Sequence, residues 1–415
     1  MKILVLCDMF PPAFGPRMGY LCKYMKRAGW EPVVVTEQID DNTFAFLKGE
    51  TPVTYVNFFR AKGKIARKME WFLVFLLDSL FHYKDRKMVK VASRLLKEGE
   101  YGGILCSTYR TFPLPAAAKL ARRYRLPFVA DLRDIIEQYA SNEYISRHFR
   151  TFPWLDKVIT AAFRHRLLRE RNKALRSADC LTTVSPWHVE MLRQYNPYVE
   201  LIYNGYDPEL FFPDPRRSTR FMVTYTGRMI SLATRDPRML FEAVARLDRE
   251  RLIAPDRFRL QWYVDADSEK LIREAAAPYS IDRYMDFSGY VPASEIPEIL
   301  NRSSILLQLA NKFTADGPKG IMTTKLFESM AVEKPLLCVR SDESCLEATI
   351  GETRSGLAAR TADEAYRFIL RQYRDWEEKG YTRMDVDRKA VESFSRERQA
   401  EQFMRIFTRL NHNRQ

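Results

Sequence analysis

The sequence predicts an α/β protein of two doubly wound domains that face a central cleft. Short apolar runs of strand length alternate with amphipathic stretches of helix length through most of the chain, which is typical of parallel sheets covered by helices. A length of 415 residues is too great for one hydrophobic core, and the hydrophobic content of 46% supplies enough apolar side chains for two. A proline-rich, charged stretch at residues 211–217 separates two such series and is the expected linker.

The first series begins with an apolar strand at residues 2–7, a loop that contains Gly15, and a helix that ends before Gly29. A second strand at residues 32–36 completes a strand-loop-helix-strand unit with glycines in the loop that would approach a ligand. The pattern G-x-G-x-x-G is absent, so a dinucleotide site is weakly supported. Further strands are expected at residues 53–59, 103–106, 127–131, 180–184 and 200–203.

The second series follows the linker and repeats the same alternation. We therefore expect an N-terminal domain over residues 1–212 and a C-terminal domain over residues 213–385. The tail from residue 362 onward reads as helical, with a last helix starting near residue 395. The expected strands are residues 221–226, 258–264, 285–288, 305–309 and 335–339.

Net charge favours anionic partners. Lys and Arg number 67 against 53 Asp and Glu, a surplus of +14. Phosphorylated ligands, an anionic bilayer and nucleic acid all fit that surplus, but no RNA-binding signature accompanies it, so we expect no nucleic-acid partner. The six cysteines form no C-x-x-C pair and the amino terminus lacks a signal-peptide pattern, so a cytoplasmic protein with reduced core thiols is expected.

The longest apolar segment, residues 71–77, is followed by Asp78 and is far too short to span a bilayer. Basic residues on both sides make it a candidate for peripheral contact with an anionic membrane, on the inner face of the cell membrane. The interpretation we prefer is a buried core helix.

Residues 323–331, followed by an apolar run, are the most informative stretch of the chain. Thr323 and Thr324 stand where they can cap a helix, and the amides and macrodipole of that helix end favour a diphosphate. Glu328 follows about a turn and a half later, within reach of a ribose diol. The alternative is a cap followed by an ordinary surface helix.

Seven segments, taken in order, resemble the GT-B glycosyltransferases, specifically the large retaining family 4 (glycosyl transferases group 1). The resemblance covers almost the whole chain and implies two Rossmann-like domains facing a cleft. It also implies that a C-terminal helix, residues 386–415, packs back on the N-terminal domain. The segments are residues 10–19, 131–134, 178–185, 203–207, 225–228, 287–291 and 325–335.

The resemblance implies that Arg228 pairs with the donor diphosphate, a task suited to a forked, permanently charged donor. A surface ion pair is its alternative. The family lysine six positions later is Thr234 here, and Arg235 is the substitute. Glu328 matches the second glutamate of the E-x7-E motif, whereas the first falls at Gly320, so that carboxylate is missing. The other residues that the resemblance assigns to the donor are Gly15, by backbone approach to the β-phosphate, Gly227, Tyr290, Thr323, Thr324 and Lys325.

Asp131 and Asp134, which follow a predicted strand, are the candidates for orienting the acceptor hydroxyl or taking its proton. None of the five histidines matches the family histidine of this neighbourhood, so any base would be a carboxylate. The alternative is that either aspartate caps the next turn. Asp265 and Asp267 imitate a metal-binding D-x-D, but the double α/β layout implies a metal-free class, so neither metal nor other cofactor is expected.

The expected activity is transfer of a sugar from a nucleoside diphosphate sugar to a glycan or lipid-linked acceptor, with retention, in cell-surface polysaccharide synthesis. Two alternatives stay open. Gly320 and the missing histidine favour a catalytically impaired nucleotide-sugar-binding or scaffold protein, and a GT-B nucleotide-sugar epimerase would use the same fold. The sequence does not indicate the base, the sugar, the acceptor, the linkage or the oligomeric state.

Overall fold

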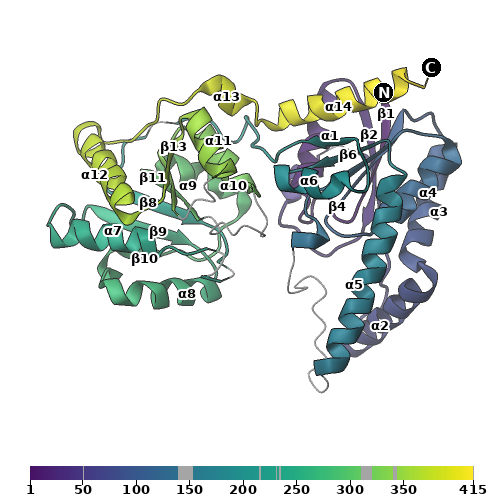
Figure 1. The fold of residues 1–415 in the computed structure, drawn as a ribbon, viewed down its shortest axis with the longest axis horizontal. Coiled ribbons are helices and arrows are strands. Elements are labelled where there is room, and N and C mark those ends of the chain that lie inside the picture. The colour runs from purple at the N-terminus through teal and green to yellow at the C-terminus, as the bar shows by residue number, and fades with distance from the viewer. Residues whose placement is uncertain are drawn as a thin grey trace. The chain divides into compact units, whose positions relative to one another are not determined.

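The computed structural model describes residues 1–49, 51–138, 153–214, 216–229, 231–232, 235–309, 320–339 and 344–414. The chain forms two compact units, Met1–Tyr203 with Gln399–Gln415, and Asn204–Arg398 (Figure 1). The first boundary falls at 203/204 and not at the expected 212/213. The physical reason is that the proline-rich stretch packs into the second unit: Phe211 is buried, and the Asn301 side chain bonds the backbone of Phe212 and Asp214.

The first unit is built on a seven-stranded sheet with the order β3-β2-β1-β4-β5-β6-β7, and all its strand pairs are parallel. Its central strands β1 and β4 are mostly apolar and almost entirely buried, because helices cover both faces. Cys7, Cys106 and Cys180 lie in it as buried free thiols, as predicted. The strands are β1 (Lys2–Cys7), β2 (Glu31–Glu37), β3 (Val53–Val56), β4 (Gly103–Thr108), β5 (Phe128–Leu132), β6 (Cys180–Thr183) and β7 (Val199–Leu201).

The last helix of the chain, α14, returns to this sheet, and the part that belongs to the first unit begins at residue 399, later than the expected 386. Phe403 and Phe407 are buried in one core with Ile3 and Val5 of β1, which is why a helix so distant in sequence belongs to this unit. The helices of the unit are α1 (Pro16–Arg27), α2 (Lys64–Phe81), α3 (Tyr83–Lys97), α4 (Leu114–Tyr124), α5 (Pro153–Arg176), α6 (Pro186–Arg193) and α14 (Arg396–His412), with short 3-10 helices η1 (Ala45–Leu47) and η2 (Ile136–Gln138).

The second unit has a six-stranded parallel sheet with the order β10-β9-β8-β11-β12-β13. Phe221, Phe258 and Trp262 fill its aromatic core. The strands are β8 (Phe221–Thr226), β9 (Phe258–Tyr263), β10 (Met285–Phe287), β11 (Ile305–Leu309), β12 (Leu336–Val339) and β13 (Gly356–Ala359). The helices are α7 (Arg238–Arg249), α8 (Ala266–Ala276), α9 (Ile296–Arg302), α10 (Thr324–Ala331), α11 (Cys345–Thr353), α12 (Ala362–Lys379) and α13 (Arg388–Glu392), with 3-10 helices η4 (Ala277–Tyr279), η5 (Asp282–Tyr284) and η6 (Ala293–Glu295).

The apolar segment at residues 71–77 is not a core helix. It lies within α2, where Val74 is the one buried residue and Phe72 and Leu73 are more than half exposed. The preferred interpretation from the sequence was therefore wrong, because an amphipathic pattern does not say which way the apolar side faces. None of the helices in the described parts of the chain has the length and apolar character that crossing a bilayer requires.

Candidate functional site

Gly227, Arg228, Arg235 and Lys325 of the predicted donor residues lie at the carboxyl end of β8, where the strand order of the second sheet reverses between β8 and β11. Open α/β sheets bind ligands at such a point, outside the carboxyl ends of their strands. Gly227 and Arg228 follow β8 directly, and Asp265 stands two residues after β9. Lys325 and Glu328 come from α10, whose preceding loop at residues 310–319 lies outside the described residues, as does Thr234.

Gly227 and Lys325 are brought into direct contact. The φ of Gly227 is 120°, and a Cβ built on it would lie 1.5 Å from Lys325 Nζ and 2.6 Å from its Cε. The ammonium group thus occupies the space that any other side chain would fill at position 227. The Lys325 Nζ also lies 5.2 Å from the centroid of the Tyr225 ring, whose π face attracts a cation.

Lys325 and Glu328 are both half-buried and stand one helical turn apart on α10. Burial, and to a smaller extent the nearby Arg235 guanidinium, lower the pKa of Lys325 to about 8. Burial raises the pKa of Glu328 to about 7, against the opposing pull of Arg396 and Lys325. Both side chains are therefore close to neutralisation near physiological pH, a property that clusters at functional sites.

Two arginines extend this basic region. Arg235 donates to the carbonyl oxygen of Arg228, and its Nη1 lies 3.5 Å from Tyr225 Oη. The Arg228 side chain is 72% exposed and its Nε donates to Asp265 Oδ2 at 2.7 Å. The surface ion pair foreseen as the alternative for Arg228 thus exists, and the diphosphate role stays a prediction.

The D-x-D pattern has a structural task. The Asp265 Oδ1 accepts from the backbone N of Ser268 at 2.9 Å and so caps α8. Within the described ranges, no group of three or more His, Cys, Asp or Glu is placed to hold a metal ion.

The amino end of α10 differs from the expectation in one respect. Thr323 is the N-cap residue with extended backbone, but its side chain makes no capping hydrogen bond, so the predicted threonine cap is wrong. The Thr323 Oγ1 instead lies 3.5 Å from Gln308 Nε2, and Thr324 is the first residue inside the helix. The Thr323 side chain therefore accepts no hydrogen bond from the amides at the start of α10. Those amides lie at the positive end of the helix dipole, which attracts an anion. Tyr290, after β10, is 70% exposed.

Gly15 stands at the N-cap position of α1 in the first unit. A Cβ there would lie 2.7 Å from the carbonyl oxygen of Met9 and 2.8 Å from the Cα of Phe10. Glycine is therefore required for the loop after β1 to fold against the start of α1. Its predicted approach to the β-phosphate stays a prediction.

Asp131, near the end of β5, is fully buried and its two oxygens accept four hydrogen bonds. Arg17 donates through Nε at 3.1 Å and Nη2 at 2.9 Å, and the hydroxyls of Ser107 and Thr182 lie at 2.7 and 2.8 Å. Arg17 and the two hydroxyls hold the pKa of Asp131 below its usual value in spite of burial. These contacts attach α1 to the sheet, and none of them supports the predicted handling of an acceptor hydroxyl.

Asp134 remains accessible in the loop after β5. Its Oδ1 accepts from Gln138 Nε2 at 2.7 Å, and burial raises the pKa of Asp134. The Gln138 Oε1 lies 2.8 Å from His188 Nε2, so a histidine does join this neighbourhood through one intermediary. Burial lowers the pKa of His188 to about 4, which keeps its imidazole neutral.

Sequence reasoning missed a second carboxylate at this edge. Asp8 follows β1 directly, and its Oδ1 pairs with Arg133 Nη2 at 2.7 Å. Burial raises the pKa of Asp8, although Arg133 opposes the shift. The sequence does contain a signal for Asp8, because Asp8 is the first charged residue after the first buried strand. It lies beside the point where the order of the first sheet reverses between β1 and β4.

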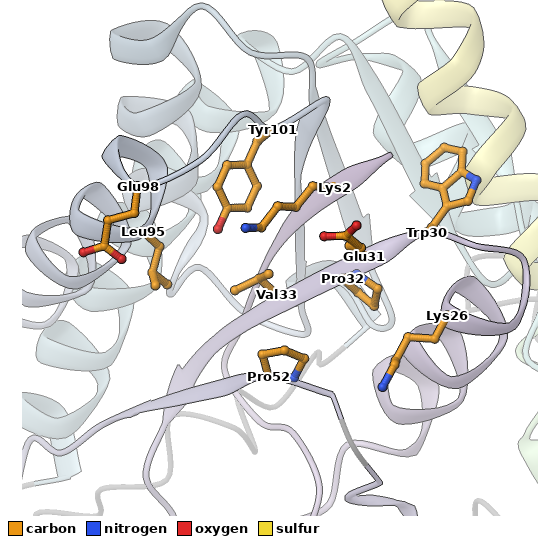
Figure 2. A pocket seen from close by; sticks show the side chains of 10 residues that line it. All are labelled: Lys2, Lys26, Trp30, Glu31, Pro32, Val33, Pro52, Leu95, Glu98 and Tyr101. Carbon is orange, nitrogen blue, oxygen red and sulfur yellow. The ribbon is translucent and has the colours of Figure 1, made fainter.

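Two cavities lie elsewhere. One of about 360 Å³ in the first unit has Lys2, Trp30, Glu31 and Tyr101 among its lining residues and opens at the amino ends of β1 and β2 (Figure 2). Another of about 460 Å³ in the second unit is lined in part by Glu333. Neither is at the carboxyl ends of the strands, so neither is the candidate site.

Residues 17–210 match the family model Glycosyltransferase Family 4. No curated protein matches the sequence.

Several solved structures have the same fold at low sequence identity. HepE of Anabaena in complex with UDP is 15% identical, with a TM-score of 0.60 over 98% of this chain and 100% of that one. Sucrose-phosphate synthase from Thermosynechococcus elongatus is 14% identical, with a TM-score of 0.60 over 99% of each chain. The lipopolysaccharide outer core galactosyltransferase WaaB is 14% identical, with a TM-score of 0.59 over 99% of this chain and 100% of that one.

These findings confirm the predicted fold class of two Rossmann-like units and the predicted transferase class. Residues 17–210 therefore match Glycosyltransferase Family 4, and the chain as a whole has the two-unit fold of the GT-B glycosyltransferases that it resembles.

Proposed function

We propose that this protein moves a sugar from a nucleoside diphosphate sugar to a glycan or lipid-linked acceptor, with retention at the anomeric carbon, in cell-surface polysaccharide synthesis. The observation that carries the proposal is the ammonium of Lys325 held above Gly227 at the carboxyl end of β8. It is supported by the similarity of the chain to HepE, which has been solved with UDP and with UDP-glucose.

The donor diphosphate binds to the basic region at the end of β8. Lys325 and Arg235 supply charge from within the site, Arg228 supplies an exposed fork, and the amides at the start of α10 add the helix dipole. A leaving diphosphate gains negative charge as the sugar departs, and these donors are in place before the reaction begins. We infer that they neutralise it without a metal ion or other cofactor.

Glu328 accepts from the ribose hydroxyls. An ionised carboxylate is the better acceptor for a diol, so ribose binding favours the charged form of Glu328, which burial alone disfavours. The sugar end of the donor is the less defined part, because Gly320 replaces the other carboxylate of the motif.

Acceptor activation belongs to the carboxyl edge of the first sheet. Asp134 and Asp8 have raised pKa values there, and a general base works best with a pKa near the working pH. Asp131 positions α1 instead, through its bonds to Arg17.

One experiment tests the proposal: purified protein is given UDP-glucose and other sugar nucleotides, and both binding and product are measured. Arg228→Ala and Glu328→Ala should abolish donor turnover and leave thermal unfolding nearly unchanged. Arg246→Ala, at an exposed arginine paired with Glu250 on α7, is the matched control and should keep wild-type turnover. Wild-type turnover in both site variants would refute the assignment.

A scaffold protein is the second candidate, because Gly320 removes a carboxylate. The same experiment separates the two: calorimetric binding of a sugar nucleotide without transfer or hydrolysis would favour the scaffold. Epimerisation of the donor in the absence of an acceptor, detected by NMR, would show that the protein is an epimerase and not a transferase.

For location, we propose a cytoplasmic protein held at the inner face of the cell membrane.

A further inference from the structure

The helix α2 turns an apolar stripe toward solvent. Six of its exposed apolar side chains recur at helical spacing and fall within an arc of about 100°. Val74, the one buried residue of the helix, lies on the opposite side. The stripe comprises Ile65 (79% exposed), Met69 (70%), Phe72 (56%), Leu73 (54%), Leu76 (38%) and Leu80 (68%).

The helix α5 runs beside α2 in the same direction. The rings of Phe75 and Phe163 lie 5.8 Å apart, and one turn further along both helices Arg166 donates to the carbonyl oxygen of Ser79. The first turns of α5 therefore accompany the first half of α2, as Figure 1 shows. Those turns are apolar and exposed as well, at Trp154, Val158 and Ile159. We call these three residues and the α2 stripe the α2–α5 apolar face.

Positive charge borders this face. Lys62, Lys64, Arg67 and Lys68 precede or open α2 and are all exposed, as is Lys157 on α5. The acidic groups of the region are Glu70, which accepts from the amides of Arg60 and Ala61 at 2.7 to 2.8 Å, Asp78, which accepts from the amide of Lys84 at 2.8 Å, and the half-buried Asp156.

The same edge of the first unit carries the acceptor candidates. The Leu167 carbonyl oxygen of α5 accepts from Thr111 Oγ1 at 3.0 Å, and Arg171 Nη1 bonds Glu137 Oε2 at 2.7 Å. Thr111 follows β4 and Glu137 follows β5, so these bonds attach the middle of α5 to the carboxyl edge of the sheet. The part of α5 that precedes them, with Trp154, projects beyond that edge.

We propose that the α2–α5 apolar face docks on an anionic phospholipid bilayer, with the stripe at the boundary between headgroups and acyl chains and the basic border on the phosphates. Trp154 fits this depth, because tryptophan favours the membrane interface. Docking brings the carboxyl edge of the first sheet to the membrane. From this placement we infer that the acceptor carries a lipid anchor, an inference that rests on the proposed function.

A second copy of the chain is the main competitor for this face. In a two-fold contact the same patch meets itself, so the basic borders of two copies would lie close together. Like charges at that distance oppose association, whereas lipid phosphates complement them. The charges therefore favour the bilayer.

The test is cosedimentation of the full chain, without donor, with vesicles of phosphatidylcholine or of phosphatidylcholine mixed with phosphatidylglycerol. We expect binding to the anionic vesicles, and a partition coefficient lower by roughly tenfold or more in the double variant Ile65→Ser with Phe72→Ser. Both residues are mostly exposed, so thermal unfolding should not change. Phe212→Ser, at an apolar residue 52% exposed in the second unit, is the control and should bind normally.

Charge and depth are tested separately. Lys64→Glu with Arg67→Glu should weaken binding to anionic vesicles only, whereas Arg193→Glu, an exposed arginine on α6, should not. Lipids brominated near the headgroup should quench tryptophan fluorescence, and Trp154→Phe should remove most of that quenching, whereas Trp71→Phe, on the other side of α2, should not.

Three results would overturn the proposal. The first is that the wild type does not bind anionic vesicles at low salt, and the second is that the Ile65→Ser, Phe72→Ser variant binds them as well as the wild type does. The third is that the wild type is a dimer in sedimentation velocity and binds no vesicles, while the variant is a monomer. The variant should keep transfer to a water-soluble acceptor. Vesicle binding by a protein that never turns over donor would contradict the proposed function and leave the docking intact.

Discussion

Replacing Gly227 by alanine tests the central contact of the donor site. The φ of 120° belongs to a region that residues other than glycine adopt at a cost of about 1–3 kcal/mol. The new Cβ would lie 1.5 Å from Lys325 Nζ, so the lysine tip must also leave its place. We expect the second unit to lose about 2 kcal/mol of unfolding free energy, a fall in Tm of about 4–8 °C.

Donor affinity should fall with it. A hydrogen bond to a charged group contributes about 1.5–3 kcal/mol, so a displaced Lys325 weakens binding of a nucleoside diphosphate sugar about ten- to a hundredfold. Calorimetry measures both quantities, as scanning for Tm and as titration for Kd. Gly29→Ala is the matched control, because φ is also positive there, at 76°, but no atom lies within 4 Å of the added Cβ.

A double-mutant cycle separates strain from displacement. In the background of Lys325→Ala the lysine tip is gone, so Gly227→Ala should lose less stability than in the wild type, by about 1 kcal/mol or more. Unchanged Tm and Kd in Gly227→Ala would refute the contact. Additive effects of Gly227→Ala and Lys325→Ala would show that the two residues do not compete for one space.

Four more outcomes follow from the contacts described above. Affinity for a nucleoside diphosphate sugar should be highest between about pH 7 and 8, because Glu328 gains a proton below that window and Lys325 loses one above it; titration calorimetry across pH should show both limbs, and Glu328→Gln should remove the acid one. The raised pKa of Glu328 also means that its carboxylate destabilises the fold above about pH 7, a penalty that is absent once the pH is below the ordinary value of 4.5 and that Glu328→Gln should abolish in thermal unfolding. Asp131→Asn should lower stability by about 3–5 kcal/mol in denaturant unfolding, because it leaves the buried guanidinium of Arg17 without its counter-charge, and a loss below about 1 kcal/mol would contradict the pairing. Arg228→Ala should change stability by less than about 1 kcal/mol, since its ion pair is exposed, yet weaken donor binding, and an unchanged Kd would remove Arg228 from the site.

Strand positions were the part of the fold that sequence predicts best. Residues 2–7 and 221–226 became β1 and β8 with the same limits, because long apolar runs between polar loops have few other solutions. The strand Gly356–Ala359 was missed. Its small side chains give no strand signal, and it forms because Gly356 lets the backbone approach the Leu336 carbonyl, where a Cβ would lie 1.9 Å from the oxygen.

Site residues were predictable one by one, but their partners were not. The resemblance named Gly227 and Lys325 separately, and only the tertiary structure shows that the ammonium of one fills the missing side chain of the other. The chain from Asp134 through Gln138 to His188 joins the segment after β5 to the helix α6, so no spacing rule reveals it. Orientation was equally hidden for α2, whose periodicity is the same whether the stripe faces a core or a membrane.

The proposed function assigns a different part of sugar transfer to each unit. The second unit gathers cations at the end of β8, the site proposed for the leaving diphosphate, and the first unit holds Asp8 and Asp134 with raised pKa values, the groups proposed as the base for the acceptor. A scaffold protein that only binds the donor would need the cations of the second unit but not the carboxylates of the first. Gly320 affects neither set, because the carboxylate it replaces is assigned to the sugar and not to the diphosphate. We therefore expect the missing carboxylate to change which sugar is accepted more than whether a donor binds, and turnover across a panel of sugar nucleotides sharing one base would measure that difference directly.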